Sequence, residues 1–500
     1  MAVKKCCRRN GTGNLDLDLD KVEVNCVEPE VASDRNEDMS LLKGIPDDIT
    51  IYHILTKLPW TAMFPISRVN SRWRRLVKSR QLYNVRVITC RGQTLVPIMH
   101  RAPMYGSPVY APSGKVSPVV QEESLHNEAM SVYDPVMESW HLLPPVPRLV
   151  AGIPKGCGCV CLNGKIYVLG GLHGSQRANS FSDTTKLGLP NSDNYDKGSR
   201  KDVYSLDLAA GDTTWTKCAD MNCGRAWFHC GVNDGNIYVF WGVNGSGGTK
   251  GFERAVVEVE VYDPGQDLWD IVAPVPCPDL VKYSMVNKFA TVGETFVIHS
   301  YFCCKDGGRI TVEHTYDTGK DEWKIVQHAK GEAAAERTDA FVTMNQKLYT
   351  IDPKNSTLKV YNEASGSWSS AFVSVLWEFL DPTIEPMPFR PYLQGLLGLS
   401  SFLRMCPEQQ LYNNNSTPTF KDVQEVLALT VVRSDLKDVT IVGLTRTTDI
   451  ITQFRNYPVQ LALFTGKWSG HDQLQIMFQE IECPHTLLDW QKFSFCPLQL

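Results

Sequence analysis

A tyrosine followed seven residues later by a tryptophan recurs along the middle of this chain, and this repeat constrains the fold more than any other feature. The copies VYDPVMESW, VYDPGQDLW, TYDTGKDEW and VYNEASGSW pair Tyr133 with Trp140, Tyr262 with Trp269, Tyr316 with Trp323 and Tyr361 with Trp368. Between the aromatic residues of most copies lie Asp with Pro or Gly, which favour a tight reversal of the chain. Each copy therefore predicts two adjacent antiparallel strands, one anchored by Tyr and the other by Trp.

A fifth copy, VYSLDLAAGDTTW, places Tyr204 eleven residues before Trp215, and from Trp215 onward successive tryptophans lie 54, 54 and 45 residues apart. A period near fifty residues, built from short strands and turns, is typical of a β-propeller in which each repeat forms one four-stranded blade. Four complete units and the half-unit ending at Trp140 predict five or six blades. We expect the aromatic residues to pack between blades, because they follow the repeat instead of gathering at one place.

A further strand pattern precedes the Tyr–Trp pairs. NGKIYVLGG covers residues 163–171, and DGNIYVFWG, VGETFVIHS and NQKLYTIDP follow at residues 234, 292 and 345. The hydrophobic run of the first copy, its Gly170 and Gly171, and the later Tyr and Trp resemble the kelch repeat. This resemblance implies a kelch-type β-propeller, and the later copies depart from the pattern by losing one or both glycines.

Residues ahead of the β-rich region follow a helical pattern instead. In LLKGIPDDITIYHILTKLPW, apolar residues at i, i+3, i+4 and i+7 predict a helix that begins at Pro46 and ends before Pro59. In ISRVNSRWRRLV, residues 66–77, the spacing predicts one helix with an apolar stripe and a separate basic stripe. Such short helices cannot bury enough apolar surface by themselves. Composition alone favours docking onto the rest of the chain, since this costs less entropy than binding a partner.

Residues 41–80 resemble the F-box, which docks onto a Skp-family adaptor of cullin-RING ubiquitin ligases. The resemblance is carried by Ile45-Pro46-Asp47-Asp48-Ile49, by Ile54-Leu55 and Leu58-Pro59, and by the closing Arg72-Trp73-Arg74. The chain departs from the usual pattern at Ile45, where Leu is common, and at VNS. The resemblance implies that a second polypeptide completes the apolar face, through the adaptor-binding residues Pro46, Ile49, Leu55, Leu58, Pro59, Val69 and Trp73.

An F-box followed by kelch repeats is similar to the plant F-box/kelch-repeat family. The resemblance implies a non-catalytic substrate-recognition subunit of an SCF-type ubiquitin ligase, with a Skp-family adaptor, a cullin scaffold and an unknown target protein as partners. One alternative is a kelch scaffold without a ligase role, which would leave the basic helix and its Trp73 unexplained. Another is a kelch-propeller metal oxidase, which needs clustered ligands, whereas the eleven histidines are scattered without a metal-binding pair.

A propeller gathers two kinds of loop at one end of its blades: those after the second strand and those after the fourth. That end receives the insertions at residues 172–200, 243–254 and 303–309, and long loops on a rigid scaffold commonly bind ligands. The same rim is predicted to carry four cations, Arg148, Arg225, Lys282 and Arg337. A ring of cations suits an acidic or phosphorylated target segment; alternatively, each cation caps loop carbonyls or lies in solvent.

The composition argues against several other classes of protein. The net charge is −5, no apolar run is long enough to cross a bilayer, and the first residues lack the hydrophobic core of a secretion signal. We therefore expect no nucleic-acid or membrane partner and a cytoplasmic and/or nuclear location. The sixteen cysteines are then free thiols. Cys157, Cys159 and Cys161 alternate as strand residues do and lack zinc-site spacing, so we expect no metal or cofactor.

These patterns predict a mainly β protein in which a small all-α module precedes a kelch-type β-propeller of five or six blades. The expected domains are a disordered segment (residues 1–39), the F-box (40–85), the propeller (86–410) and a C-terminal segment (411–500). Whether this last segment supplies closing strands is left open by the sequence.

Overall fold

The structure is a computed structural model, and it describes most of the chain between residues 40 and 500. The described ranges are 40–89, 91–101, 128–146, 153–154, 156–172, 199–242, 258–276, 281–304, 309–327, 341–344, 346–352, 357–362, 367–378, 421–434, 438–449, 460–469, 475–481 and 497–500. Contacts divide the chain into two units, Met1–Asp47 and Asp48–Leu500. The segment predicted to be disordered, residues 1–39, lies outside the described residues.

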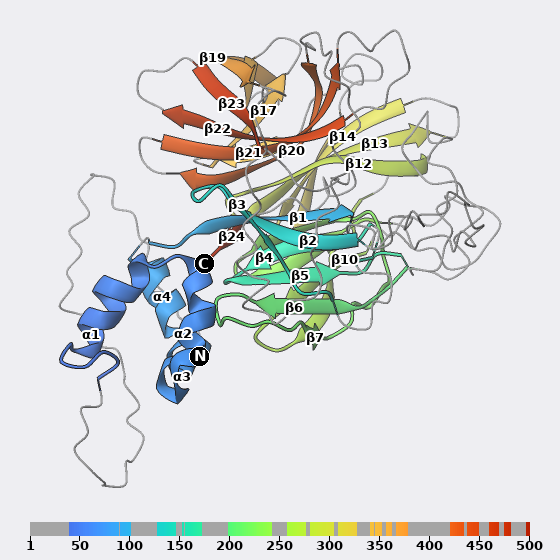
Figure 1. Ribbon diagram of the computed structural model, residues 1–500. Helices are drawn as coiled ribbons and strands as arrows, with labels where there is room; N and C mark the ends of the chain where they lie inside the picture. Colours follow the sequence, from blue (N-terminus) through green and yellow to red (C-terminus); the bar gives the residue numbers. More distant parts are fainter. Residues whose placement is uncertain are drawn as a thin grey trace, which may run out of the picture. The chain divides into compact units, whose positions relative to one another are not determined.

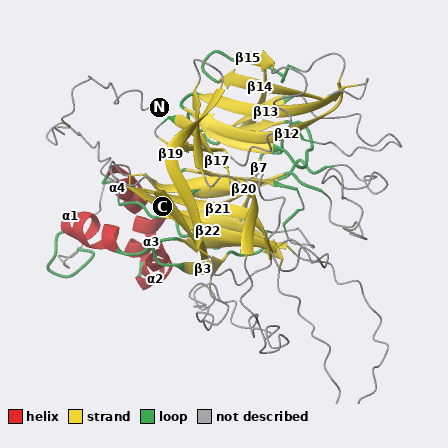
Figure 2. Cartoon of the chain, turned by 90° about the horizontal axis from the view of Figure 1, so that it is seen from above, coloured by secondary structure: helices red, strands yellow, loops and turns green. Residues whose placement is uncertain are grey.

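Short helices form the first part of the described chain. They are α1 (Asp47–Ile49), η2 (Thr50–Ile54), η3 (Leu55–Lys57), η4 (Trp60–Ala62), α2 (Met63–Val69), α3 (Ser71–Lys78) and α4 (Gln81–Ile88). In Figure 2 the helices are red and the strands that follow them along the chain are yellow. The helical region predicted before Pro59 is therefore present as three consecutive short helices.

The prediction of one continuous helix over residues 66–77 is wrong. Asn70 leaves the helical conformation, with φ −160° and ψ −178°. Its side-chain oxygen accepts hydrogen bonds from the backbone N–H groups of Arg72 at 2.9 Å and Trp73 at 3.0 Å, which makes it the N-cap of α3. Because the helix restarts here, Val69 and Trp73 do not share a stripe: Val69 is 63% exposed and Trp73 only 7%.

The described strands form five sheets (Figure 1). The first contains β1 (Thr94–Arg101), β2 (Glu128–Asp134), β3 (Ser139–Leu142) and β24 (Leu498–Gln499). The second contains β4 (Gly158–Leu162), β5 (Lys165–Leu169), β6 (Val203–Asp207) and β7 (Thr216–Cys218). The third contains β8 (His229–Asn233), β9 (Asn236–Phe240), β10 (Val259–Asp263) and β11 (Leu268–Val272). The fourth contains β12 (Val281–Val292), β13 (Thr295–Cys304), β14 (Arg309–Asp317) and β15 (Glu322–Gln327).

The fifth sheet has eight strands and consists of two four-stranded meanders. One meander is β16 (Phe341–Met344), β17 (Lys347–Asp352), β18 (Thr357–Asn362) and β19 (Ser367–Glu378). The other is β20 (Lys421–Ser434), β21 (Asp438–Asp449), β22 (Gln460–Ser469) and β23 (Gln475–Ile481). Parallel pairing of β19 with β23 joins the two. The prediction of a mainly β propeller is confirmed. The described strands form five sheets, and they form six four-stranded units when the two meanders of the fifth sheet are counted separately.

The two ends of the propeller sequence meet in the first sheet. The C-terminal strand β24 pairs antiparallel with β1 and supplies an edge of this sheet, so residues from opposite ends of the fold share one blade (Figure 1). The first strand of each blade lies next to the first strand of the following blade. The neighbouring pairs are β24 and β4, β4 and β8, β8 and β12, β12 and β16, and β16 and β20. The strand β20 also lies beside β1, which completes the ring. Residues 411–500 therefore contain both the strands β20–β23 and the strand that closes the ring.

The register places each recurring tyrosine directly opposite its tryptophan. The paired residues are Tyr133 and Trp140, Tyr262 and Trp269, Tyr316 and Trp323, and Tyr361 and Trp368. Their ring centroids lie 4.8–5.2 Å apart. The longer fifth copy differs, because Tyr204 pairs with Lys217 and Trp215 lies just before β7. The turn length therefore decides whether the aromatic pair forms across the hairpin.

Three of these tryptophans also join neighbouring blades. The indole Nε1 of Trp215 donates to the carbonyl oxygen of Pro144 at 2.8 Å, that of Trp269 to Ala219 at 3.0 Å, and that of Trp323 to Ala273 at 2.9 Å. Each acceptor follows the last strand of the preceding blade. The repeated tryptophan thus contributes apolar area to its own blade and a hydrogen bond to the one before it.

The glycine pair lets the connection between the second and third sheets pass close to β5. Gly170 and Gly171 have positive φ angles of 59° and 93°. A Cβ atom at Gly170 would lie 2.5 Å from the carbonyl oxygen of Arg225, and that same oxygen accepts a hydrogen bond from the N–H of Gly171 at 2.9 Å. Glycine is therefore required here both for its backbone conformation and for space.

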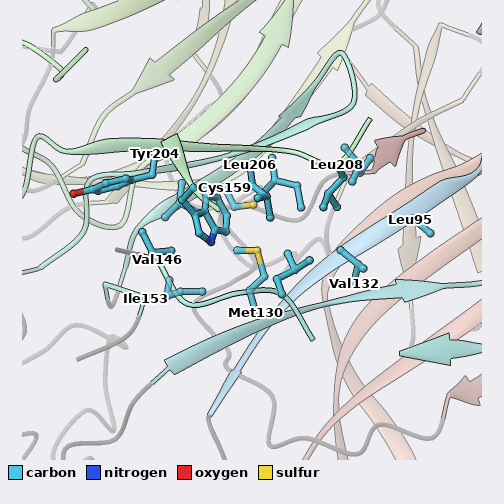
Figure 3. Close-up of a cluster of buried hydrophobic side chains, with 14 of the residues drawn as sticks. Leu95, Met130, Val132, Val146, Ile153, Cys159, Tyr204, Leu206 and Leu208 are labelled. Atoms are coloured by element: carbon cyan, nitrogen blue, oxygen red, sulfur yellow. The ribbon is translucent and has the colours of Figure 1, made fainter. Parts of the chain in front are cut away.

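The first and second sheets share one apolar core. Figure 3 shows its side chains gathered from both sheets, among them Met130 and Val132 of β2 and Cys159 of β4. Cys157 and Cys159 are buried in this core, and Cys161 is partly buried against it. All three are free thiols, so they pack as small apolar side chains.

Candidate functional site

The helices after Asp48 dock onto the propeller through Trp60 and Phe64. Both side chains are buried in the core that the first two sheets share. The Trp60 ring makes edge-to-face contacts with Phe64, at 5.6 Å between centroids, and with His141 of β3, at 5.2 Å. Burial lowers the pKa of His141 to about 4, so this imidazole is neutral near pH 7. The propeller therefore covers one apolar side of the helical module.

Gln93 makes the polar counterpart of this contact. Its side-chain oxygen accepts from the backbone N–H of Trp60 at 2.5 Å, and its side-chain nitrogen donates to Asp134 at 3.2 Å. Its backbone exchanges two hydrogen bonds with Leu500, at 2.7 and 2.8 Å. A single residue thus holds together the helical module, the first blade and the C-terminal strand.

The C-terminal half of the helical module contacts the second sheet. Lys78 forms an ion pair with Asp212, and Arg80 pairs with Asp207 at 3.4 Å and donates to the carbonyl oxygen of Asn163. Asn163 lies in the β4–β5 turn, Asp212 in the β6–β7 turn, and Asp207 is the last residue of β6. In a meander such turns lie at the opposite end of the blade from the connections after the second and fourth strands. The described contacts of the module therefore lie at the opposite end of the second blade from those connections.

Two arginines hold the module together internally. Arg86 of α4 is buried and donates to the carbonyl oxygens of Leu55 at 3.3 Å and Leu58 at 2.6 Å. Arg91 donates to the carbonyl oxygen of Tyr52 at 2.9 Å. Burial lowers the pKa of Arg86 to about 10, which still leaves it charged near pH 7. These bonds connect α4 and Arg91 to backbone carbonyls of η2, of η3 and of the residue that follows η3.

Several apolar side chains of the helical module are not covered by the propeller. We call them the exposed helical surface: Ile49, Tyr52, Val69, Val87 and Ile88. Ile88, at 78% exposure, is the most open of them. Large apolar side chains exposed together on one small module are typical of a protein-binding surface. The module's apolar residues are thus divided between an intramolecular contact and a surface open to a partner.

The seven residues predicted to bind an adaptor lie in three environments. Pro46, Ile49, Pro59 and Val69 are exposed, and Leu58 is half-buried. Leu55 and Trp73 are buried, so they support the surface by packing from inside. The sequence reasoning did not identify Tyr52, Val87 or Ile88, although VRVI at residues 85–88 carries apolar residues up to the end of α4.

Arg225 is not a rim cation available to a target, and this part of the prediction is wrong. Its side chain is fully buried and forms an ion pair with Glu260. Nη1 donates to the carbonyl oxygens of Trp241 at 3.0 Å and Glu258 at 3.1 Å. The alternative, in which the cation caps loop carbonyls, therefore describes Arg225. The pair joins the connection between the second and third sheets to β10.

For the other three rim cations the binding role stays a prediction. Arg148 and Arg337 lie outside the described residues, and Lys282 lies in β12 with its side chain outside them. Across the described ranges, no three His, Cys, Asp or Glu side chains are grouped so that they could hold a metal ion. In the same part of the chain, none of the helices is long and apolar enough to span a membrane.

Comparisons with known proteins find a repeat motif in the propeller and relatives that align over much of the chain. Residues 154–182 match a family described as the Kelch motif. The F-box/kelch-repeat protein At1g22040 of Arabidopsis thaliana is 24% identical over 433 residues, which are 79% of this chain and 82% of that protein. The F-box/kelch-repeat protein At1g16250 of the same plant is 24% identical over 66% of this chain and 74% of that protein. A human Kelch repeat and BTB domain-containing protein 12 is 25% identical over 41% of this chain and 31% of that protein.

Proposed function

Because the chain belongs to the plant-type F-box/kelch-repeat family, we propose that it is the substrate-recognition subunit of an SCF-type ubiquitin ligase. The exposed helical surface docks a Skp-family adaptor, which connects the chain to a cullin, and the propeller binds the target protein. The chain itself supplies binding surfaces and no catalytic group. We place this activity in the cytoplasm and/or nucleus, where free cysteines such as Cys157 and Cys159 stay reduced.

The observation that carries the proposal is the division of the module's apolar side chains. Trp60 and Phe64 are satisfied by the propeller, but Ile49, Tyr52 and Val69 stay exposed after that contact has formed. Exposed branched and aromatic side chains lose solvent-ordered water when a partner covers them, which stabilises the complex by about 25 cal/mol for each Å² of apolar area. Intramolecular docking alone does not account for these residues.

The placement of the module also suits a receptor. It contacts the β4–β5 and β6–β7 turns, while loops that follow the second and fourth strands lie at the other end of each blade. An adaptor on the helices would therefore not compete with a target on the loops. The propeller contacts made by Trp60 and Lys78 would hold the two binding regions in a fixed relation during ubiquitin transfer.

A scaffold without a ligase role is the second candidate. The contact of Trp60 and Phe64 with the propeller favours it, because this contact gives the helices a structural task that needs no partner. The two functions differ in what is bound at the exposed helical surface. A scaffold would keep all its partners when this surface is changed, whereas a ligase receptor would lose the adaptor and the cullin together.

The experiment compares two exposed valines. Val69→Asp places a charge on the exposed helical surface, and Val136→Asp places the same charge on the β2–β3 turn, where Val136 is 67% exposed. We expect Val69→Asp to weaken adaptor binding at least about tenfold, because the adaptor would then have to cover a charged side chain in place of an apolar one, and Val136→Asp to bind normally. Binding of purified adaptor is measured by calorimetry, and cullin recovery by affinity purification.

Equal adaptor affinity of both variants and the natural chain would show that Val69 lies outside the contact. Absence of adaptor binding by the natural chain would contradict the ligase function and leave the scaffold. Point variants suit this test better than removal of residues 41–80, since that deletion would also take away Trp60 and Phe64 and open the propeller core.

A further inference from the structure

After Asp47 and Asp48 at its start, the helical module carries positive charge without any compensating acid. From Ile49 to Gln121 the sequence contains no aspartate and no glutamate, although the net charge of the chain is −5. Within the helical part, residues 49–89, there are eight lysines and arginines. The module is therefore a basic region on a protein that is acidic elsewhere, which gives the molecule an uneven field.

Part of this charge is used to hold the module in place. Lys78 and Arg80 pair with Asp212 and Asp207 of the second sheet, and Arg86 is buried against backbone carbonyls. Lys78 and Arg80 thus find acceptors in the propeller, and Arg86 finds them within the module. These contacts do not account for the cations on the other side of α3.

Arg74 and Arg75 lie on that other side. In α3 the side chains of Trp73, Leu76 and Val77 are buried, while those of Arg74 and Arg75 are exposed. Among the ion pairs formed by described residues, neither arginine has a carboxylate partner. They are therefore open to charges supplied from outside the molecule.

A hydrogen bond brings Arg74 next to the end of α2. Its Nε donates to the carbonyl oxygen of Ser67 at 3.2 Å, one residue before the exposed Arg68 and two before Val69. We call Arg68, Val69, Arg74 and Arg75 the basic surface. It combines exposed guanidinium groups with an aliphatic side chain that is 63% exposed. Guanidinium groups bind carboxylates through two parallel hydrogen bonds, and the valine requires an apolar contact.

We infer that the basic surface receives an acidic segment of the adaptor, whose carboxylates pair with Arg74 and Arg75 while an apolar side chain covers Val69. The inference rests on the proposed function, since it names the chemistry of the partner at the same module. A protein segment matches both parts of the surface, whereas a phosphate backbone would leave Val69 in water. The negative charge of the rest of the chain repels an acidic partner from other approaches, so the basic surface orients the encounter.

The test measures how fast the purified adaptor associates with the full chain at about 50 mM and about 500 mM salt. Arg74→Glu/Arg75→Glu reverses the charge, and Arg74→Gln/Arg75→Gln removes it. Lys324→Glu/Lys347→Glu makes the same change in net charge at exposed positions of β15 and β17. Thermal unfolding verifies that each variant is folded, and the neutral variant keeps the test valid where the charge-reversed one does not fold.

We expect charge reversal to slow association at low salt at least about tenfold, with an intermediate effect for the neutral variant and little change in dissociation. At high salt the difference should shrink, and the lysine variant should stay within about twofold of the natural chain. If the association rate is the same for the natural chain and both arginine variants at both salt concentrations, the inference is overturned, although adaptor binding itself is retained. If the natural chain binds no adaptor, the proposed function falls as well. Tighter arginine-dependent binding of a short DNA duplex or of phosphatidylserine vesicles would also overturn it.

Discussion

Replacement of Trp269 by Phe tests whether the hydrogen bond between blades stabilises the propeller. Phenylalanine keeps an aromatic ring at this buried position but removes the N–H that donates to Ala219 at 3.0 Å. Loss of the donor leaves the carbonyl of Ala219 without this partner, at a cost of about 1–3 kcal/mol. The smaller ring removes roughly 1 kcal/mol of packing in addition. We expect Trp269→Phe to lower the free energy of unfolding by about 2–4 kcal/mol.

Trp60→Phe is the matched control, because it makes the same substitution at a buried tryptophan with a different hydrogen-bonding state. Trp60 is 1% exposed, and its Nε1 has no hydrogen-bond partner among the described groups. Phenylalanine again loses about 1 kcal/mol of packing here but also removes an unsatisfied donor whose burial costs about 1–3 kcal/mol. The net change in the free energy of unfolding should therefore be near zero or favourable.

The two variants are compared by urea unfolding followed by far-ultraviolet circular dichroism, which mainly reports the backbone and not the tryptophans. A midpoint that falls for Trp269→Phe and stays for Trp60→Phe would support the argument. Equal loss of stability would refute it, since packing alone would then explain both. Trp323→Phe, which removes the bond to Ala273, should repeat the result for Trp269.

Two further predictions follow from backbone space and from pKa. Gly170→Ala should lower the free energy of unfolding by about 2–4 kcal/mol, because the new Cβ would meet the carbonyl of Arg225. Gly235 also has a positive φ, but no atom lies within 4 Å of a Cβ placed there, so Gly235→Ala should lower it by only about 1–2 kcal/mol. Thermal unfolding of both variants measures the difference. The pKa of His141 is about 4 in the folded chain and near 6.5 in the unfolded chain. Its contribution to the free energy of unfolding is therefore fully present above pH 6.5 and is lost as the pH falls to 4. Urea unfolding should show that the free energy of unfolding of the natural chain falls between pH 7 and pH 5, and that it falls less for His141→Gln.

The repeat made the propeller predictable because its information is local. Tyr133 and Trp140 are separated by a short turn, so two residues in one hairpin determine strand direction, register and spacing. Gly170 and Gly171 likewise mark a close approach of backbone that no other residue type permits. The same reasoning was weaker for the helices, where one residue, Asn70, changed a continuous stripe into two helices by capping the second.

The sequence by itself determined the β-propeller, its recurring aromatic anchors and a basic helical module whose apolar residues exceed what it can bury. Only the tertiary structure decided which of those residues the propeller covers, that Arg225 is enclosed with Glu260, and that strand β24 closes the first blade. The reason is physical: strand and turn preferences act between near neighbours in the chain, whereas burial and ion pairing depend on residues such as Trp60 and His141, or Gln93 and Leu500, that only folding brings together.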